Sequence, residues 1–136
     1  MFAAVLSLAL AATAPISIVH QNRMGPAFRL VRSVLVLDDE VLVDREGGPG
    51  PGLEAVIDGK VAPGAHVLRV ELHYQGSGGG AFPYLEGYRF RVSAQFRFTS
   101  LPGVPLRLEV MGHEQGGPTT PWEEKPAIAF RLWSRG

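Results

Sequence analysis

Apolar residues recur at every second position over a long stretch of the chain, and this alternation constrains the fold more than any other feature. From residue 88 to residue 99, one set of positions is aromatic or aliphatic and the other set is polar. Successive side chains of a β-strand point to opposite faces, whereas a helix would scatter both sets around its axis. The stretch therefore predicts a half-buried strand. The apolar set is Tyr88, Phe90, Val92, Ala94, Phe96 and Phe98, and the polar set is Arg89, Arg91, Ser93, Gln95, Arg97 and Thr99.

The same two-residue period marks further segments on both sides of this stretch. It is regular in 68–74, 104–110 and 128–133, and the last of these is expected to close a sheet edge. The alternation in 28–37 breaks near Arg32 and Ser33, which predicts a β-bulge or a strand buried on both faces. Shorter apolar segments bring the expected total to seven or eight strands, and they lie at 16–20, 41–43 and 53–57. Because no helical segment separates the strands, we expect an all-β fold, an antiparallel β-sandwich.

Turn residues with specific backbone requirements separate the expected strands. Asp58-Gly59 suits a two-residue hairpin turn, Asp38-Asp39 is expected to turn similarly, and Pro63-Gly64 suits a type II turn. Loops carry binding residues more often than the strands that support them. Flexible connections without a binding role are the simpler interpretation of loops that are rich in Gly and Pro. Three longer Gly- and Pro-rich loops are expected, at 47–52, 76–83 and 112–126.

Length and charge narrow the class of protein. A chain of 136 residues is long enough for one domain that buries roughly two-thirds of its unfolded surface, without metal or disulfide support. Its 13 basic and 13 acidic side chains balance, which argues against a nucleic-acid partner. The absence of cysteine removes cysteine zinc sites and thiol catalysis.

The first residues have the composition of an export signal. Residues 1–14 contain no charged side chain, and 2–12 are apolar except for Ser7. This run is too short to span a bilayer, which takes about 20 residues. Small residues suit cleavage after Ala11, whereas Pro15 disfavours cleavage after Ala14. We expect residues 1–14 to be a signal peptide, residues 15–136 to form the single sandwich domain, and the protein to be periplasmic or extracellular with no transmembrane span. The alternatives are a buried first helix or a missed upstream start codon.

No catalytic, cofactor or metal site is predicted. The glycine cluster at 76–80 lacks the following helix that a phosphate-binding loop needs. His66 and His73 are seven residues apart on one expected strand, so they point to opposite faces and do not converge on a metal. The chain has no G-x-S-x-G or S-x-x-K motif, and its adjacent acidic pairs are solvated turns rather than facing carboxylates.

Two groups of side chains are candidates for binding. The arginines on the polar faces of expected strands are a candidate basic face, with cross-strand ion pairs to Glu71 and Glu109 as the plainer interpretation. The aromatic residues outside the alternating core are candidates for partner contact, although Trp122 alternatively caps an open end of the core. The arginines are Arg89, Arg91, Arg97, Arg107 and Arg131, and the aromatic residues are Phe82, Tyr84, Trp122 and Trp133.

Segment 56–70 resembles PEGA-type and related transthyretin-like modules of bacterial envelopes. The likeness consists of a hairpin, then Pro63-Gly64-Ala65-His66, then an alternating strand, and Ala65 follows Gly64 with no Glu between Pro63 and Gly64. The tail at 117–126 is similar to stretches in uncharacterised exported bacterial proteins, some labelled acyltransferases. The His-x-x-x-Asp-Gly motif of that chemistry is missing here, because Glu54 precedes Asp58-Gly59 where His is required. The resemblance implies an Ig-like or transthyretin-like sandwich that acts as a surface-interaction module.

The resulting functional hypothesis is a non-catalytic binding or scaffolding module of the bacterial cell envelope. It is expected to contact a protein partner through the loops at 76–83 and 112–126. A module that binds a carbohydrate or cell-wall polymer is one alternative, and a hydrolase with an unrecognised site is another.

Overall fold

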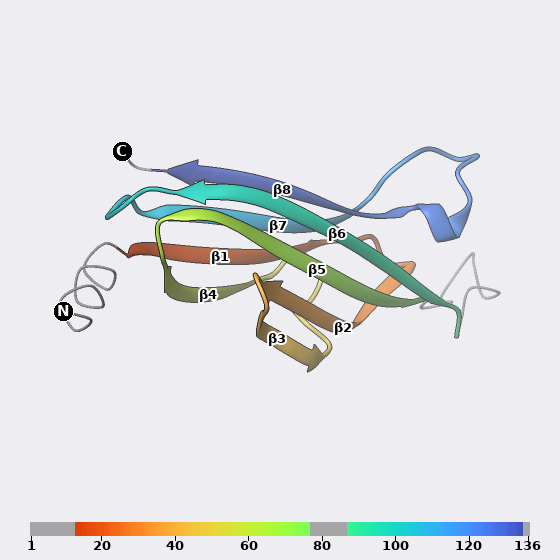
Figure 1. Cartoon of the computed structure of the whole chain (residues 1–136). Helices are drawn as coiled ribbons and strands as arrows, with labels where there is room; N and C mark the ends of the chain where they lie inside the picture. The colour runs from red at the N-terminus through yellow and green to blue at the C-terminus, as the bar shows by residue number, and fades with distance from the viewer. Residues whose placement is uncertain (1–12, 77–86, 135–136) are drawn as a thin grey trace, which may run out of the picture.

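The computed structural model describes residues 13–76 and 87–134, and this part of the chain is all-β (Figure 1). The prediction of a β-sandwich is confirmed. One short 3-10 turn, η2 (Trp122–Glu124), precedes the last strand. The strands are β1 (Ala14–Arg23), β2 (Phe28–Leu37), β3 (Glu40–Glu46), β4 (Glu54–Val61), β5 (Gly64–Gly76), β6 (Arg89–Ser100), β7 (Leu106–Glu114) and β8 (Pro126–Ser134).

The strands form two four-stranded sheets that lie one over the other (Figure 1). Sheet A has the order β4-β1-β7-β8, and sheet B has the order β3-β2-β5-β6. Every pairing is antiparallel except that of β1 with β7, which is parallel. As expected, the last strand closes an edge, that of sheet A. β1 therefore joins the first and last thirds of the chain.

The alternation of the sequence becomes the division between core and surface. On β5 the buried positions are Leu68, Val70, Leu72 and Tyr74, and the side chains between them are more exposed. Phe28 packs edge-on against Tyr74 and Phe90, with ring centroids 6.3 and 5.2 Å apart. Burial of one large apolar side chain contributes about 1.5 to 3 kcal/mol to the free energy of folding.

The polar and apolar sets of β6 separate as expected, with one exception. Phe90 and Phe98 are buried, and Phe96 stacks on Phe130 of the opposite sheet with ring centroids 5.1 Å apart. Tyr88 is 60% exposed and precedes the strand, so its assignment to the apolar face is wrong. The alternation in the sequence thus extends one residue beyond the strand. Tyr88 lies in the connection before β6, where its carbonyl accepts a hydrogen bond from the Gly76 N–H.

The turn predictions have mixed outcomes. Asp38 has a φ of 55° in the turn between β2 and β3, which confirms a turn there. Asp58-Gly59 is not a hairpin turn: it lies inside β4, where Asp58 pairs with Ser17 of β1 and accepts a 2.7 Å hydrogen bond from its hydroxyl. The chain instead changes sheets after Val61, and Gly64 takes a φ of 118° there. The predicted irregularity in β2 is a bulge at Val31.

Several predictions concern residues at the margins of the described part. Most of the predicted signal segment, residues 1–12, lies outside it, as do most of the 76–83 loop, which includes Phe82, and the following Tyr84. Ala14 is already the first residue of β1 and is fully buried. β7 extends to Glu114, so the third predicted loop is shorter than expected. Within the described ranges, no helix has the length and apolar character needed to cross a membrane.

Candidate functional site

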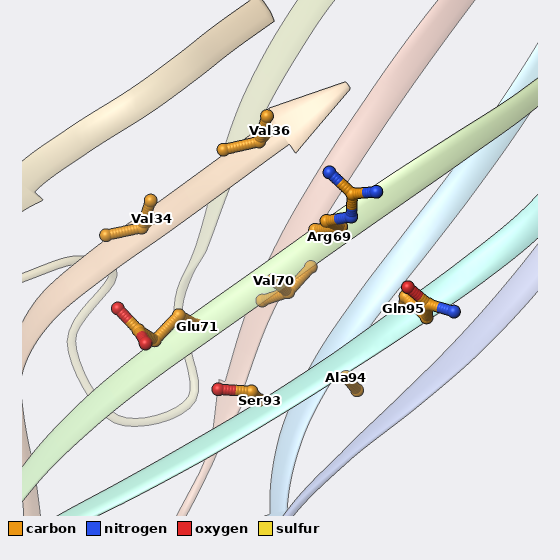
Figure 2. Close-up of a pocket in the computed structure, with 8 residues that line it drawn as sticks. All are labelled: Val34, Val36, Arg69, Val70, Glu71, Ser93, Ala94 and Gln95. Atoms are coloured by element: carbon orange, nitrogen blue, oxygen red, sulfur yellow. The ribbon is translucent and has the colours of Figure 1, made fainter. Parts of the chain in front are cut away.

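The outer face of sheet B carries an open groove of about 490 Å³, a size typical of ligand-binding clefts (Figure 2). Val34 and Val36 of β2 are half-buried along one side. The polar groups come from β5 and β6. On β5, Arg69 lies opposite Val36 of β2 and Gln95 of β6. Glu71 lies opposite Val34 of β2 and Ser93 of β6 in the same way. The groove is thus amphipathic.

Some polar side chains of the groove form ion pairs, and others are available to bind a ligand. Glu71 lies 3.0 Å from His73 Nε2 and 3.5 Å from Arg91. The hydrogen bond from His73, aided by the nearby charges of Arg91 and Arg32, holds the pKa of Glu71 below its usual range. The side chains of Ser93 and Gln95 make no hydrogen bond to any other described residue.

The predicted basic face is divided between two surfaces. Arg89, Arg91 and Arg97 lie on the exposed face of β6 in sheet B, whereas Arg107 and Arg131 lie on the outer face of sheet A. The five arginines therefore do not form a single surface. Alternation assigns a residue to the outer side of its own strand, but it does not say which sheet that strand joins.

The predicted aromatic contact residues do not converge within the described part either. Trp122 packs on Phe28, with ring centroids 5.8 Å apart, and Lys125 Nζ lies 4.6 Å from its ring centre. Trp122 thus covers one end of the core, which was the alternative interpretation. Trp133 lies beside Arg107 and Arg131 on the outer face of sheet A, with guanidinium carbons 6.0 and 5.3 Å from its ring.

A cluster that the sequence analysis missed lies at the end of the sandwich where β2, β4 and β6 finish. His66 Nδ1 donates to Asp38 Oδ2 at 2.9 Å, and Nε2 donates to the Ala62 carbonyl at 2.6 Å. Burial alone would lower the pKa of His66, but these hydrogen bonds and the Asp38 charge together raise it above its usual value. The fold therefore favours the imidazolium form of His66, which links the turn at Asp38 to the turn at Ala62.

Ser100 completes an Asp-His-Ser grouping, but its geometry does not suit nucleophilic attack. Ser100 Oγ is 3.3 Å from His66 Nε2 and donates to the Ala62 carbonyl at 2.6 Å. Ser100 is only 1% exposed. A catalytic base needs a free lone pair facing an accessible hydroxyl. Here the same carbonyl occupies both the imidazole nitrogen and the hydroxyl, so the cluster is structural.

This cluster predicts a pH-dependent contribution to stability. Because the folded pKa of His66 is raised, its contribution is fully present below pH 6.5 and is lost as the pH rises through the folded pKa. His66→Gln is expected to lower the free energy of unfolding by about 2 kcal/mol at pH 6. The loss is expected to be smaller at pH 9 because the imidazole of the wild type loses its charge as the pH rises. The half-exposed position of Asp38 limits the size of the effect. Urea denaturation of the wild type, His66→Gln and Asp38→Asn at both pH values measures this. An equal loss at pH 6 and pH 9 would contradict the imidazolium assignment.

The two histidines of β5 point to opposite faces of the strand. His66 faces the core side and His73 the solvent side of β5, as their spacing predicts. In residues 13–76 and 87–134, no three His, Asp or Glu side chains are grouped to hold a metal ion.

Comparison with known proteins adds no family. No protein-family model matches the chain, and no curated protein matches it.

Proposed function

We propose that the protein is a non-catalytic binding module that holds an extended, acidic segment of a protein partner on the outer face of sheet B. The observation that carries this proposal is the open groove of Val34, Val36, Ser93 and Gln95 beside a strand whose arginines are partly unmatched. The loops predicted as the contact region contribute less to this proposal, because Trp122 is packed on Phe28.

The charge pattern beside the groove favours an acidic partner. Arg32 is paired with Asp44, Arg69 lies 3.9 Å from Asp39, and Arg91 is paired with Glu71. Among the described residues, Arg89 and Arg97 form no ion pair and are exposed. They are eight residues apart on one strand, which is roughly 26 Å at about 3.3 Å per residue. A segment with carboxylates at a similar separation would match both charges.

The outer face of sheet A is a weaker candidate because its own side chains cover it. Val19 and Glu109 are buried there although they point away from the core. Gln21 Nε2 donates to Glu109 Oε1 at 3.3 Å, and Arg107 and Arg131 lie beside Trp133. A partner would have to displace these contacts before it could bind.

We further propose that the module acts after export into the cell envelope. The uncharged, apolar residues 2–12 support this, since they have the pattern of a signal peptide. Cleavage after Ala11 would leave β1 intact, whereas cleavage after Ala14 would remove a buried residue of the strand. The likeness of segment 56–70 to PEGA-type and transthyretin-like modules is compatible with this role.

Charge reversal on β6 tests the binding surface. The probe is a fluorescent nine-residue peptide of Thr and Val with Glu at both ends, and the control peptide has Gln at those positions. Arg89→Glu/Arg97→Glu is expected to weaken binding of the acidic peptide at least tenfold in fluorescence anisotropy, because two attractions become repulsions. Raising the salt concentration is expected to weaken wild-type binding as well.

A matched double variant on the other sheet separates the site from net charge. Arg107→Glu/Arg131→Glu makes the same change of charge on the outer face of sheet A and is expected to alter binding by less than twofold. Equal losses in both double variants, or equal binding of the Gln peptide, would contradict the proposal.

Photo-crosslinking in cells that express the protein tests whether a natural partner uses this face. Benzoylphenylalanine at Gln95 is expected to capture a discrete protein, and the same residue at Val56, exposed on sheet A, is not. Capture of a polysaccharide rather than a protein at Gln95 would favour the cell-wall polymer alternative. Equal capture at both positions would overturn the proposed surface.

A further inference from the structure

A second recess, smaller and more enclosed than the groove, lies between the two sheets beside the edge strands β3 and β4. Its volume is about 130 Å³. Apolar cavities of about 150 Å³ accept a benzene-sized molecule, so this recess has room for a ligand of roughly six or seven heavy atoms. Side chains from four strands form its walls, and the apolar ones on the core side are Leu35, Val43, Ala55 and Ile57.

His20 gives this recess a buried polar group without a partner. The residue is 4% exposed, and its Nε2 makes no hydrogen bond to any described residue. Burial, aided by the charge of Arg45, lowers the pKa of His20 to about 4, so the imidazole is neutral at physiological pH. A buried polar atom without a hydrogen bond costs about 1 to 3 kcal/mol. A ligand that accepts a hydrogen bond from Nε2–H would recover part of this cost.

Arg45 gives the recess a positive charge. It pairs with Ser33, a core-side residue of β2, and its exposed side chain lines the recess. In the described part of the chain Arg45 has no ion-pair partner. No carboxylate lines the recess: Asp44 is bound to Arg32 on the outer face of sheet B, and Glu54 accepts from Gln21 on the outer face of sheet A. The Ser33 hydroxyl is already used, since it donates to the Gly47 carbonyl at 2.8 Å.

We propose that this recess is a binding site for a small monocarboxylate with a short, branched or cyclic apolar tail. The carboxylate pairs with Arg45 and accepts a hydrogen bond from His20 Nε2. The tail contacts Leu35, Val43 and Ile57, where burial of about 25 cal/mol per Å² of apolar surface stabilises it. This site is distinct from the groove on sheet B, and neither proposal depends on the other.

The requirement for both a charge and a tail can be tested with three ligands. Isovalerate has both features, isovaleramide has the tail without the charge, and acetate has the charge without the tail. In an NMR titration of the wild type, isovalerate is expected to shift the ring signals of His20 and the side-chain signals of Arg45 saturably. Isovaleramide and acetate are each expected to bind at least tenfold more weakly.

Variants locate the binding within the fold. Arg45→Gln is expected to weaken isovalerate binding at least tenfold, and Ala55→Leu, which fills the recess, is expected to abolish it. Arg97→Gln removes an unpaired arginine from sheet B and serves as the control, with less than a twofold effect. Retention of wild-type affinity in both Arg45→Gln and Ala55→Leu would overturn the site, as would isovalerate shifts confined to the β6 arginines. The dispersion of the amide spectrum verifies that each variant is folded.

Discussion

Gly112→Ala is expected to lower the free energy of unfolding by about 3 kcal/mol, and Tyr74→Phe in the same chain is expected to remove most of that loss. Gly112 lies on the core side of β7, in sheet A, and Tyr74 lies on β5, in sheet B. A Cβ at Gly112 would overlap the Tyr74 hydroxyl, whereas the ring carbon that carries this hydroxyl is 3.6 Å away. The severe overlap is therefore with one oxygen atom, and Leu72 Cδ1, at 3.3 Å, would have to move slightly as well. Overpacking of a core typically costs about 1 to 3 kcal/mol.

Tyr74→Phe alone is expected to leave stability unchanged or to raise it by about 1 kcal/mol. The Tyr74 hydroxyl is buried without a hydrogen-bond partner in the described structure, and burial raises its pKa. Removing a buried polar group that lacks a partner is close to neutral or favourable. A double-mutant cycle by urea denaturation measures the coupling between the two positions, which is expected to be about 2 kcal/mol. Additive effects would show that Gly112 and Tyr74 are not in contact.

Acidification from pH 6.5 to pH 4 is expected to remove about 3 kcal/mol of stability through His20 alone. Burial first, and then the charge of Arg45, lowers the folded pKa of His20 to about 4, against 6.5 in the unfolded chain. Between these values the unfolded chain binds more protons, so the stability from this group is full above pH 6.5 and falls as the pH drops. The difference between a pKa of 6.5 and one of about 4 corresponds to about 3.5 kcal/mol over the full titration, at about 1.4 kcal/mol for each tenfold change, and about 3 kcal/mol of this is lost by pH 4.

The variant His20→Leu isolates this effect, because carboxylates also titrate in the acid range. Relative to the wild type, His20→Leu is expected to show a flatter dependence of the unfolding free energy on pH between 6.5 and 4. His66 has the opposite sign and weakens the fold as the pH rises above 6.5, so the two histidines place the stability maximum near neutral pH. Parallel curves for the wild type and His20→Leu would contradict the assignment of His20 as a buried neutral imidazole.

The strands were predictable because alternation is a local property. The period of two in 68–74 and 128–133 places Leu72 and Phe130 on the core side without any knowledge of their neighbours. Pairing between strands is not local. Nothing in the sequence indicated that Arg97 and Arg107 would lie in different sheets, or that β1 would pair in parallel with β7.

The turn at Asp58-Gly59 was misread because turn propensity is weaker than a hydrogen-bonded ladder. β4 pairs with β1 from Glu54 to Val61, and this pairing extends the strand through both residues. Propensity describes what a dipeptide favours alone, and tertiary pairing overrides it.

The candidate sites were less predictable than the strands. The two-residue alternation places His66 on the core side together with Leu68. It does not predict the contact of His66 with Asp38, which is 28 residues away in another turn. His20 gave no local signal beyond its place at the end of an apolar run. Its significance depends on Arg45, which the fold brings to the same recess from the other sheet.

The central claim is that two sheets face each other through their apolar sides, since the groove and the recess both require this packing. Phe96 of β6 and Phe130 of β8 test it most directly, because their rings stack 5.1 Å apart although they belong to different sheets. In a NOESY spectrum with specifically labelled phenylalanines, cross-peaks between these two rings are predicted. Intact strand pairing within each sheet, together with no cross-peak between Phe96 and Phe130, would contradict the account.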